Sequence, residues 1–547
     1  MPDAPVSADL SLLAALASDL ASVHYTVDGV AELLGVSASE ALGRDQTVPA
    51  LLVVDDVPAA RATEGLAVVV FVWLLGQPVS EVRLSAAFPR TGVNGLRQLG
   101  LAAPVAAGPE FAGTELTAPA GAAPQKPADV MWTALVDLRP YGWEATADGG
   151  GGADLWVASD LSAHQRDGVL RKDHVLGIGH ASLTLAQLTV RRPVARALDL
   201  GAGCGIQTFH LLQHAQHVTA TDISARALAF TRFNVLLNSG MLGVDPEHPE
   251  GRISLRLGSL LEPVAGESFD LVVSNPPFVI TPRNRGETAA EQFTYRDGGL
   301  PGDDIVATLV RRLPSALIAG GTAQLLGNWE IPADCPWDER PRSWVPDSAD
   351  AWFIQRDVAS PARYAETWLK DAAEGRDRGH YVRAYGAYLK DFAARNVEGI
   401  GFGYIWLRRP DRSAAPRLRR FEELTHPLQS PLGPVLGAAV ERFDWLSGAE
   451  LDAAHLLVAE DVTEERHQRP GAEHPGVILV RQGAGLRRTN LLSTELAGFV
   501  SACDGDLAVG QLIAALAGLL ERSDPAFGVQ LRHDVRNLVL EGFLIPG

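Results

Sequence analysis

The sequence predicts an α/β protein whose central part is a parallel sheet covered by helices on both faces. Between residues 130 and 410, short apolar strand-like runs alternate with helical patterns, which is typical of such a sheet. Residues 1–100 read instead as short amphipathic helices, and the chain beyond residue 425 combines strand-like runs with three helical patterns. Because 547 residues exceed what one hydrophobic core usually holds, we expect several domains.

Residues 1–128 are predicted to form a helical, winged-helix-like domain. The runs SEVRLSAAF and TGVNGLRQLGL predict two short helices around Pro89, an arrangement similar to a winged helix. The apolar run at residues 66–75 is about half the ~20 residues that span a bilayer, so it predicts a buried helix and no membrane association. An Ala-, Pro- and Gly-rich stretch at residues 102–129 predicts a linker.

Residues 129–425 are predicted to hold seven strands, in the order RALDL, HVTATD, ISLRLG, FDLVVS, TAQLLG, AWFIQ and GFGYIWL. A glycine-rich turn follows the first strand, where Gly201, Gly203 and Gly205 let the backbone turn tightly and let a ligand approach closely. Asp222 ends the second strand, where a carboxylate can accept hydrogen bonds from a ribose diol. The alternative is a turn that only packs a helix on a strand, with Asp222 as a helix cap.

The spacing of these glycines distinguishes between two nucleoside ligands. A nicotinamide dinucleotide site normally has the pattern G-x-G-x-x-G, whereas this turn has G-x-G-x-G with Ile206 in the sixth place. S-adenosylmethionine has no pyrophosphate, so the turn would cradle its methionine part while Asp222 holds the ribose. The spacing therefore favours S-adenosylmethionine.

The fourth strand runs into SNPPF, which places Asn275 at the edge where open α/β sheets bind ligands. Pro276 and Pro277 fix their own φ and restrict the residue before them, so the segment is predicted to be rigid. A planar amide or aromatic amine is a weak nucleophile because its lone pair is delocalised. If the Asn275 side-chain oxygen and the Pro276 carbonyl accept its two N–H bonds, the nitrogen is held toward a methyl sulfonium, and Phe278 can stack on the planar group. An ordinary turn is the alternative.

Taken together, DLGAGCG, TDIS and SNPPF resemble the motifs of class I S-adenosylmethionine-dependent N-methyltransferases. YRDGGLPGDDIV, at residues 295–306, is similar to the Asp-Gly-Gly segment that follows this motif in the release-factor glutamine methyltransferase family. The resemblance covers about residues 130–330 and implies a Rossmann-like seven-stranded methyltransferase core. The catalytic positions that it implies are Asn275, Pro276, Pro277 and Phe278. The implied S-adenosylmethionine-binding positions are Asp199, Gly201, Ala202, Gly203, Gly205, Asp222, Ile223, Ser259, Leu260 and Asn275.

Two segments depart from the pattern of these families. Many relatives carry an Asp after the third strand to reach the adenine amine, whereas this chain has Ser259, so that contact is expected from Ser259 or the Leu260 backbone. The run HVLGIGHASLTLAQL stands where the glutamine methyltransferases have a Pro-Arg-rich loop, and it lacks those residues. We expect methyl transfer to a planar nitrogen, with a protein glutamine amide favoured. An exocyclic amine in RNA or DNA, a small molecule or peptide, and a cofactor-binding scaffold without activity remain open.

Between the sixth and seventh strands, residues 357–398 carry a helical pattern. The connection to an antiparallel last strand lies on the same edge as the ligand site, so we expect a lid-like insertion over the pocket. Its aromatic residues recur at helical spacing, which favours core packing over a base-stacking platform. These residues are Tyr381, Tyr385, Tyr388 and Phe392.

Two clusters are weaker candidates for function. The spacing of His210, His214 and His217 would suit a metal, but no cysteine is near, so we expect histidines on a solvated helix and no metal site. The one basic patch is predicted to be a solvated, partly paired surface, with contact to RNA or an acidic protein as the alternative. Its members are Arg408, Arg409, Arg412, Arg417, Arg419 and Arg420.

Residues 426–547 are predicted to be a C-terminal α/β region that ends in a small helical, winged-helix-like module at residues 490–547. The net charge of the whole chain is −19, which disfavours binding to a phosphate backbone without a local basic face. Three widely spaced cysteines suit a reducing compartment better than a disulfide framework, so a cytoplasmic location is expected. The partner is expected to be a protein or a nucleic acid, and the pattern does not indicate an oligomeric state.

Overall fold

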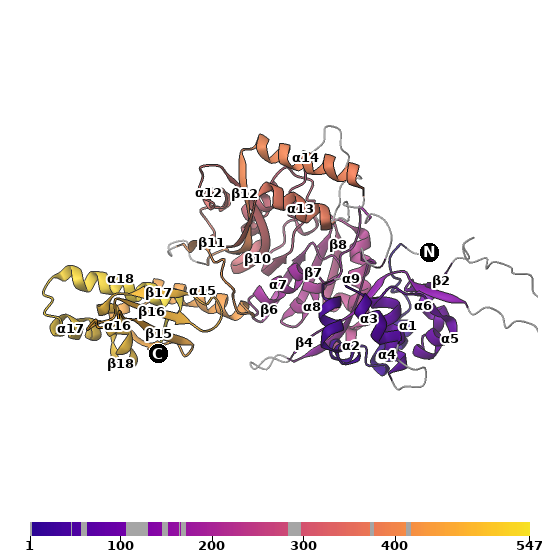
Figure 1. Cartoon of the computed structure of the whole chain (residues 1–547), viewed down its shortest axis with the longest axis horizontal. Coiled ribbons are helices and arrows are strands. Elements are labelled where there is room, and N and C mark those ends of the chain that lie inside the picture. Colours follow the sequence, from indigo (N-terminus) through magenta and orange to yellow (C-terminus); the bar gives the residue numbers. More distant parts are fainter. Residues whose placement is uncertain are drawn as a thin grey trace, which may run out of the picture.

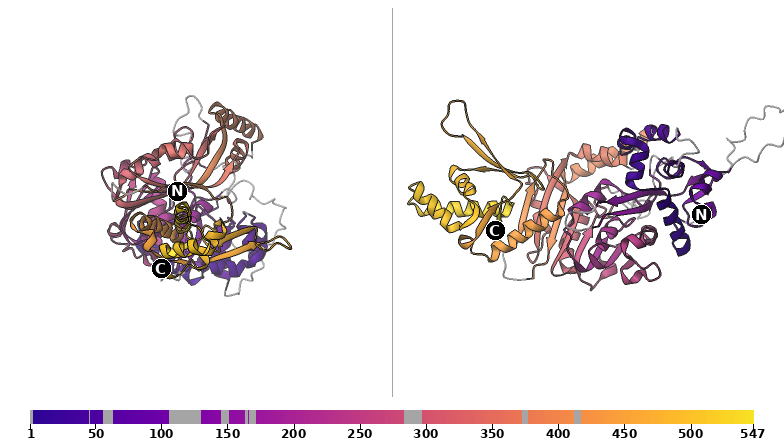
Figure 2. Two further views of the ribbon diagram at one scale, coloured as in Figure 1. Left: turned by 90° about the vertical axis from the view of Figure 1, so that its left-hand side faces the viewer. Right: turned by 90° about the horizontal axis from the view of Figure 1, so that it is seen from below.

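The computed structural model describes residues 3–44, 46–55, 63–105, 130–144, 151–162, 165, 171–282, 297–371, 377–411 and 417–547. Arg412 and residues 295–296 of the Asp-Gly-Gly segment lie outside the described residues. A large central sheet separates an N-terminal helical part from a C-terminal α/β part, and these two parts lie at opposite ends of the long axis (Figures 1 and 2).

The described part of the central sheet has eight strands, in the order β13-β11-β12-β10-β9-β6-β7-β8. Strands β6 to β10 are parallel, with the β8-β7-β6-β9-β10 order of a doubly wound sheet, and β12 runs antiparallel between β10 and β11. The bounds are β6 Val194–Leu200, β7 Ala215–Asp222, β8 Ile253–Leu257, β9 Phe269–Ser274, β10 Leu317–Pro332, β11 Asp350–Ala359, β12 Val397–Arg408 and β13 Arg419–Glu423. The seven predicted strands and the Rossmann-like fold are confirmed, and β13 adds an eighth strand parallel to β11.

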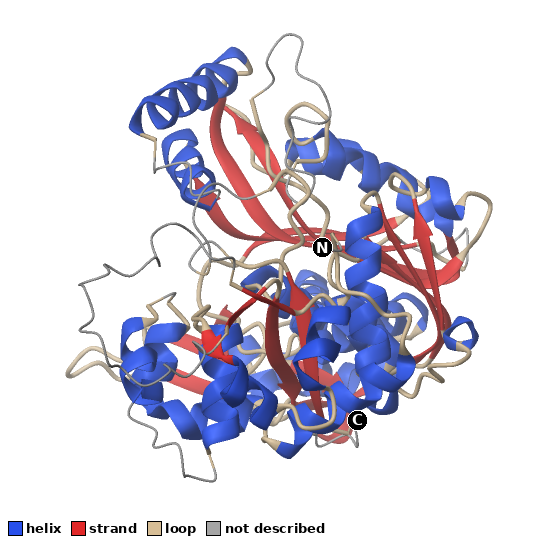
Figure 3. Ribbon diagram, turned by 90° about the vertical axis from the view of Figure 1, so that its right-hand side faces the viewer, coloured by secondary structure: helices blue, strands red, loops and turns tan. Residues whose placement is uncertain are grey.

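Helices cover both faces of this sheet (Figure 3). Successive strand residues enter different cores: Leu271 and Val273 pack with Phe209 and Phe233, while Val272 packs in a second cluster with the helix at residues 304–312. This alternation follows from the period of two in a strand. The helices of the central part are α7 His180–Leu188, α8 Ile206–Leu212, α9 Ala225–Leu237, α10 Ser239–Leu242, α11 Asp304–Arg312, α12 Glu339–Trp344, α13 Pro361–Asp371 and α14 Arg378–Ala394.

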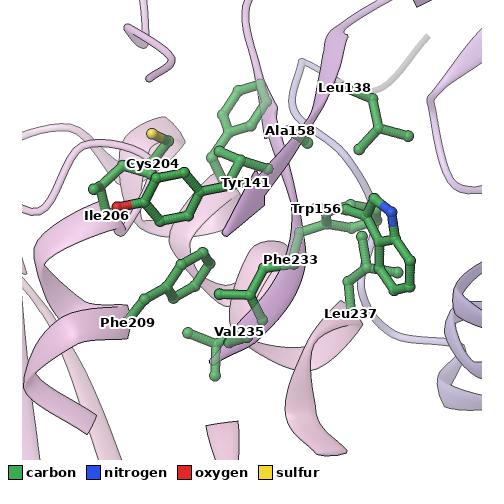
Figure 4. Packing of buried hydrophobic residues seen from close by; sticks show 14 of the residues in the cluster. Leu138, Tyr141, Trp156, Ala158, Cys204, Ile206, Phe209, Phe233, Val235 and Leu237 are labelled. Atoms are coloured by element: carbon green, nitrogen blue, oxygen red, sulfur yellow. The ribbon is translucent and has the colours of Figure 1, made fainter. Parts of the chain in front are cut away.

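A β-hairpin, β4 Asp137–Trp143 and β5 Ala153–Ser159, packs onto helices α8 and α9. Figure 4 shows its aromatic rings among the apolar side chains of these helices. Two buried asparagines, one in α9 and one directly after it, accept hydrogen bonds from the β5 backbone. The Asn234 Oδ1 atom accepts the Ala158 N–H at 2.8 Å, and the Asn238 Oδ1 atom accepts the Trp156 N–H at 2.9 Å. The hairpin therefore joins the N-terminal part to the helices that follow the glycine turn.

The N-terminal part is helical, as predicted, and two of its helices are followed by strands. Its helices are α1 Leu10–Ser22, α2 Val27–Leu42, α3 Val48–Asp55, α4 Glu64–Val69, a π-helical turn at Val70–Leu74, α5 Glu81–Ala87 and α6 Gly92–Gln98. A three-stranded sheet has the order β1-β3-β2, with bounds β1 Val79–Ser80, β2 Ala102–Pro104 and β3 Met131–Ala134. The helix of the apolar run at residues 66–75 is buried, as predicted.

Among the described residues, no single helix has the length and apolar composition needed to cross a bilayer. Helices α1 and α2 meet those two criteria only when they are taken together, across a bend of 42°.

The C-terminal part contains the three predicted helices and two three-stranded sheets. Strand β14 lies between β18 and β19 and is antiparallel to both, just as β3 lies between β1 and β2. The segment predicted as a module at residues 490–547 thus shares its sheet with an earlier strand. The bounds are α15 Gly433–Gly448, β14 His455–Val458, β15 Val462–His467, β16 Val477–Gln482, β17 Thr489–Leu492, α16 Thr494–Ser501, β18 Asp504–Ala508, α17 Val509–Leu519, α18 Pro525–Glu541 and β19 Leu544–Pro546.

Candidate active site

The glycine turn between β6 and α8 uses a backbone conformation that favours glycine. Gly201, Gly203 and Gly205 have φ of +80°, +58° and +96°, in the left-handed region that costs other residues strain. A Cβ on Gly203 would meet no heavy atom within 4 Å, so the turn has open space on that side. The N–H groups of Gly201 and Ala202 both donate to the carbonyl oxygen of Thr221, at 2.9 and 3.0 Å. The turn is therefore fixed against β7 and open beside Gly203.

Asp222 joins this turn to the next helix. Its Oδ2 atom accepts the Gly203 N–H at 3.0 Å, and its Oδ1 atom accepts the Ser224 N–H at 2.8 Å. A carboxylate oxygen has a second acceptor position, so both oxygens can still bind a diol. Burial raises the pKa of the carboxyl group above its ordinary value. The neighbouring Ile223 side chain is 60% exposed, an apolar surface of the kind that a nucleoside ring can cover.

Asp199 lies in β6, just before the turn, and its carboxyl group is buried. Its Oδ2 atom accepts a hydrogen bond from the Thr208 hydroxyl at 2.6 Å. Its Oδ1 atom is buried and has no hydrogen-bond partner among the described residues. Burial raises the pKa of Asp199 to about 7. A buried acceptor without a partner, beside a glycine turn with open space, suits the ammonium group of the methionine part of S-adenosylmethionine.

The segment that follows β9 lies directly beside the glycine turn. The Ser274 hydroxyl donates to the Leu200 carbonyl at 2.7 Å, and a Cβ on Gly201 would lie 4.0 Å from the Asn275 carbonyl oxygen. No hydrogen bond joins the Asn275 side chain to another described residue. The structure thus brings the two predicted halves of the site, Gly201 and Asn275, to one edge of the sheet.

The two prolines of this segment lie within a tight turn. The Phe278 N–H donates to the Pro276 carbonyl at 2.7 Å, and that carbonyl oxygen keeps a second lone pair. Phe278 also forms an antiparallel bridge with Asp297, the first residue of the Asp-Gly-Gly sequence. A Cβ on Gly298 would lie 2.8 Å from the Ile305 side chain, so a glycine lets this segment pack against α11. The two motifs are therefore neighbours in space.

Ser259 and Leu260 follow β8 at the same edge of the sheet. The preceding Gly258 donates its N–H to the Asp222 carbonyl oxygen at 3.0 Å, which fixes the loop next to the second strand. Leu260 has a φ of +48°, unusual for a residue with a branched side chain. Both side chains are partly exposed. The structure places them beside Asp222, and an adenine contact at these residues stays a prediction.

One ion pair near this edge was not predicted from the sequence. The Arg226 Nη1 atom, at the start of α9, lies 2.5 Å from Asp160 Oδ2, and the two groups also share a second contact. Asp160 also accepts the Val175 N–H at 2.8 Å and is itself almost fully buried. This pair ties the segment before α7 to the helix that follows Asp222. No local signal marks it, because Asp160 and Arg226 are far apart in the chain.

The histidine cluster bonds to other protein groups. His210 is buried, so the expectation of a solvated helix was wrong for this residue, because β4 covers it. Its Nε2 atom lies 2.5 Å from the Tyr141 hydroxyl, and burial lowers its pKa to about 3. The His217 Nε2 atom pairs with the Ser254 hydroxyl at 2.9 Å. Within the described ranges, no group of three or more His, Cys, Asp or Glu side chains is arranged to hold a metal ion.

Arginines of the basic patch form ion pairs with acidic residues of the same chain. Arg408 pairs with Asp350 at 2.7 Å and with Asp444 at 2.5 Å. Arg420 lies 3.2 Å from Glu422. These pairs agree with the predicted partial pairing and leave less free charge for a nucleic acid. The expectation of a solvated surface was wrong for Arg408 and Arg420, whose side chains are only 15% and 22% exposed.

Two family models match the chain. Residues 163–295 match the Methyltransferase small domain, and residues 22–112 match a domain of unknown function. The first match contains the glycine turn, Asp222 and the Asn275–Phe278 segment. The second lies in the N-terminal helical part.

Curated relatives include two glutamine methyltransferases. The chain is 31% identical over 202 residues to the ribosomal protein uL3 glutamine methyltransferase of Bradyrhizobium diazoefficiens, which covers 35% of this chain and 59% of that protein. It is 31% identical over 151 residues to the release factor glutamine methyltransferase of Geobacter sulfurreducens. This match covers 26% of this chain and 49% of that protein. The match to the ribosomal RNA small subunit methyltransferase C of Alcanivorax borkumensis is 28% over 137 residues, covering 25% and 33%. The chain thus spans only about half the length of the two glutamine methyltransferases.

Similar solved structures include a methyltransferase from Pyrococcus furiosus, with 14% identity and a TM-score of 0.23 over 44% of this chain and 89% of that one. The strand order, the glycine turn and the sequence relatives carry the assignment. Residues 163–295 match the Methyltransferase small domain, and this part of the chain has the Rossmann-like fold of class I S-adenosylmethionine-dependent methyltransferases.

Proposed function

We propose that this protein transfers a methyl group from S-adenosylmethionine to the side-chain amide nitrogen of a protein glutamine. The observation that carries the proposal is the position of Asn275 beside Gly201, which brings an amide-binding segment to the edge of a cofactor-type turn. The glutamine methyltransferases among the relatives support the choice of acceptor. The acidic net charge of −19 also favours a protein over a nucleic acid.

The residues around the glycine turn have distinct roles in this proposal. Asp199 binds the ammonium group of the methionine part through its free Oδ1 atom, and Asp222 binds the ribose hydroxyls. Ile223 covers one side of the adenine, while Ser259 and Leu260 contact its edge. When bound, S-adenosylmethionine supplies a methyl group on a positively charged sulfur.

The segment after β9 binds and orients the acceptor. The Asn275 side-chain oxygen and the second lone pair of the Pro276 carbonyl accept the two N–H bonds of the amide. Pro277 stiffens the segment, and Phe278 stacks on the amide plane. Holding the nitrogen in one orientation compensates for its weak nucleophilicity. The proton that the nitrogen loses passes to water, so no strong base is required.

The test is transfer of labelled methyl groups into a lysate of the source organism, followed by separate protease and nuclease digestion. Label that protease alone releases, found on glutamine, is the expected result. Asn275→Ala is expected to reduce the transfer rate by about a hundred-fold, since it removes an orienting hydrogen bond. Calorimetry measures how much of this loss comes from weaker S-adenosylmethionine binding, because Asn275 also lies beside the glycine turn. Label on glutamine that does not depend on Asn275 would contradict the proposed acceptor site.

A base amine in RNA is the second candidate, because the relatives include a ribosomal RNA methyltransferase and a planar amine fits the same acceptors. Label released only by nuclease would establish it and overturn the glutamine proposal. A protein that binds S-adenosylmethionine and labels nothing would be the scaffold alternative.

We propose a cytoplasmic location on separate grounds. The three cysteines, Cys204, Cys335 and Cys503, are all free thiols, which suits a reducing compartment.

A further inference from the structure

The insertion α13–α14 lies at the same edge of the sheet as the proposed acceptor site. It connects the end of β11 to the start of β12, and Val397 at that start pairs with Pro332 at the carboxyl end of β10. Residues on the insertion share a hydrophobic cluster with Val279 and Ile280, the two residues after Phe278. The insertion therefore packs directly on the continuation of the acceptor segment.

Tyr364 on α13 makes the closest link. Its hydroxyl accepts the Ile280 N–H at 2.8 Å and a second hydrogen bond from the Asn328 side-chain amide at 2.9 Å. Its ring is fully buried and stacks on Phe402 of β12, with centroids 5.7 Å apart and planes at 21°. This tyrosine thus fixes the backbone two residues after Phe278 to two strands of the central sheet.

Trp368 lies one turn further along α13. Its ring meets the Phe278 ring edge to face, with centroids 6.4 Å apart and planes at 77°, and lies 6.0 Å from the Tyr364 ring. Phe278 is the ring that stacks on the acceptor amide in the proposed function. Because an edge-to-face contact restricts how the Phe278 ring can tilt, Trp368 limits the shape of the group that fits beside it.

The insertion is also anchored at its far end. Arg395, directly after α14, pairs with Glu330 of β10 at 2.7 Å and with Asp391 at 2.8 Å. Glu330 is almost fully buried. An insertion held by a buried tyrosine at one end and a buried ion pair at the other forms a fixed structure and does not need to swing.

We propose that α13–α14 is a fixed wall of the acceptor site, in which Tyr364 is a positioning residue for the acceptor segment and Trp368 is a specificity-determining residue beside Phe278. The inference rests on the proposed function only for the claim that the acceptor binds beside Phe278. The packing of the wall on the acceptor segment can be tested in the full-length protein without any acceptor.

The first test is hydrogen exchange of the full-length protein, read in a peptide that contains Ile280. Tyr364→Phe keeps the ring and removes the hydroxyl that binds this amide, so exchange is expected to become roughly five-fold faster. Tyr385→Phe is the matched control, because it removes a hydroxyl that bonds Glu366 within the same insertion at 3.0 Å and does not touch the acceptor segment. Equal exchange in wild type and Tyr364→Phe would overturn the positioning role.

Trp368→Ala is the second variant, and it is first measured by the same hydrogen-exchange experiment, which needs no acceptor. Loss of the ring beside Phe278 is expected to accelerate exchange in the same peptide, whereas Trp368→Phe retains most of the contact and stays near wild type. If the peptide exchanges at the wild-type rate in Trp368→Ala, Trp368 does not help to hold the acceptor segment, and its place in the wall is wrong.

The second measurement is the labelled-methyl assay. Its substrate is the lysate fraction that the wild-type protein methylates. Trp368→Ala and Tyr364→Phe are expected to raise KM for the acceptor about ten-fold, with the Kd for S-adenosylmethionine within about two-fold of wild type. An unchanged KM would overturn the specificity role. A wild-type protein that labels nothing would refute the proposed function instead. The hydrogen-exchange results would still show whether α13–α14 holds the acceptor segment in place.

Discussion

The buried carboxyl group of Asp199 makes cofactor binding sensitive to pH. Its pKa of about 7 means that the ionised fraction rises from about a tenth at pH 6 to about three quarters at pH 7.5. The cofactor amino group, with an ordinary pKa near 8, stays mostly charged over this range. Because the ionised carboxylate attracts this ammonium group, we expect about five-fold tighter S-adenosylmethionine binding at pH 7.5 than at pH 6. Calorimetry at the two pH values measures it.

The control for this prediction is Asp199→Asn, which keeps the size of the side chain and an acceptor for the Thr208 hydroxyl. It is expected to bind more weakly and with little pH dependence. If the variant shows the same pH dependence as wild type, another group titrates, and Asp222 is the first to examine because burial also raises its pKa.

Residues that belong to one local motif could be predicted from the sequence, and residues joined by distant contacts could not. Gly201 and Asn275 each follow an apolar strand, and the parallel strand order brings such positions to one edge. Tyr364 was not predicted, because its partner Ile280 comes from a different strand connection. The Asp160–Arg226 pair had no signal at all for the same reason.

At the level of elements, an ion pair links the residue after α14 to β10. Arg395→Met would leave Glu330 buried without its cation, which typically costs 3–5 kcal/mol for a fully buried pair. Because the Arg395 side chain is 31% exposed, we expect a loss of about 2 kcal/mol in the free energy of unfolding. Denaturant titration measures it. The double variant Glu330→Gln/Arg395→Met should regain part of the loss, and an equal loss in both would contradict this account.

Strands differ in how far their sequence reveals them. The parallel strands β6 and β9 are apolar because both faces are covered, so their runs stand out. Strand β13, RRFEE, carries four charged residues and sits at the edge of the sheet, where charge is tolerated, so its sequence does not read as a strand. Its Glu422 instead pairs with Arg488 of the C-terminal part at 2.6 Å, which the strand pattern could not indicate.

At the scale of the whole molecule, the C-terminal part has its own hydrophobic cluster, drawn from residues between Leu446 and Leu544. A fragment of residues 433–547 contains that cluster and is expected to fold. A fragment of residues 490–547 lacks β14, Ile478 and Val480, and is expected to be unfolded in circular dichroism and amide NMR spectra. A cooperative thermal transition in the shorter fragment would contradict the role of β14 as the central strand.

The place of β14 also bears on the order in which this protein can form while it is being synthesised. The N-terminal sheet receives its middle strand, β3, last, after both outer strands have left the ribosome. The C-terminal sheet has the reverse order, so β14 emerges first, and both of its edges stay without a partner until β18 and then β19 have been made. An unpaired strand edge can join the wrong neighbour. The nascent C-terminal part therefore passes through a stage in which both edges of β14 are open to wrong pairing and aggregation.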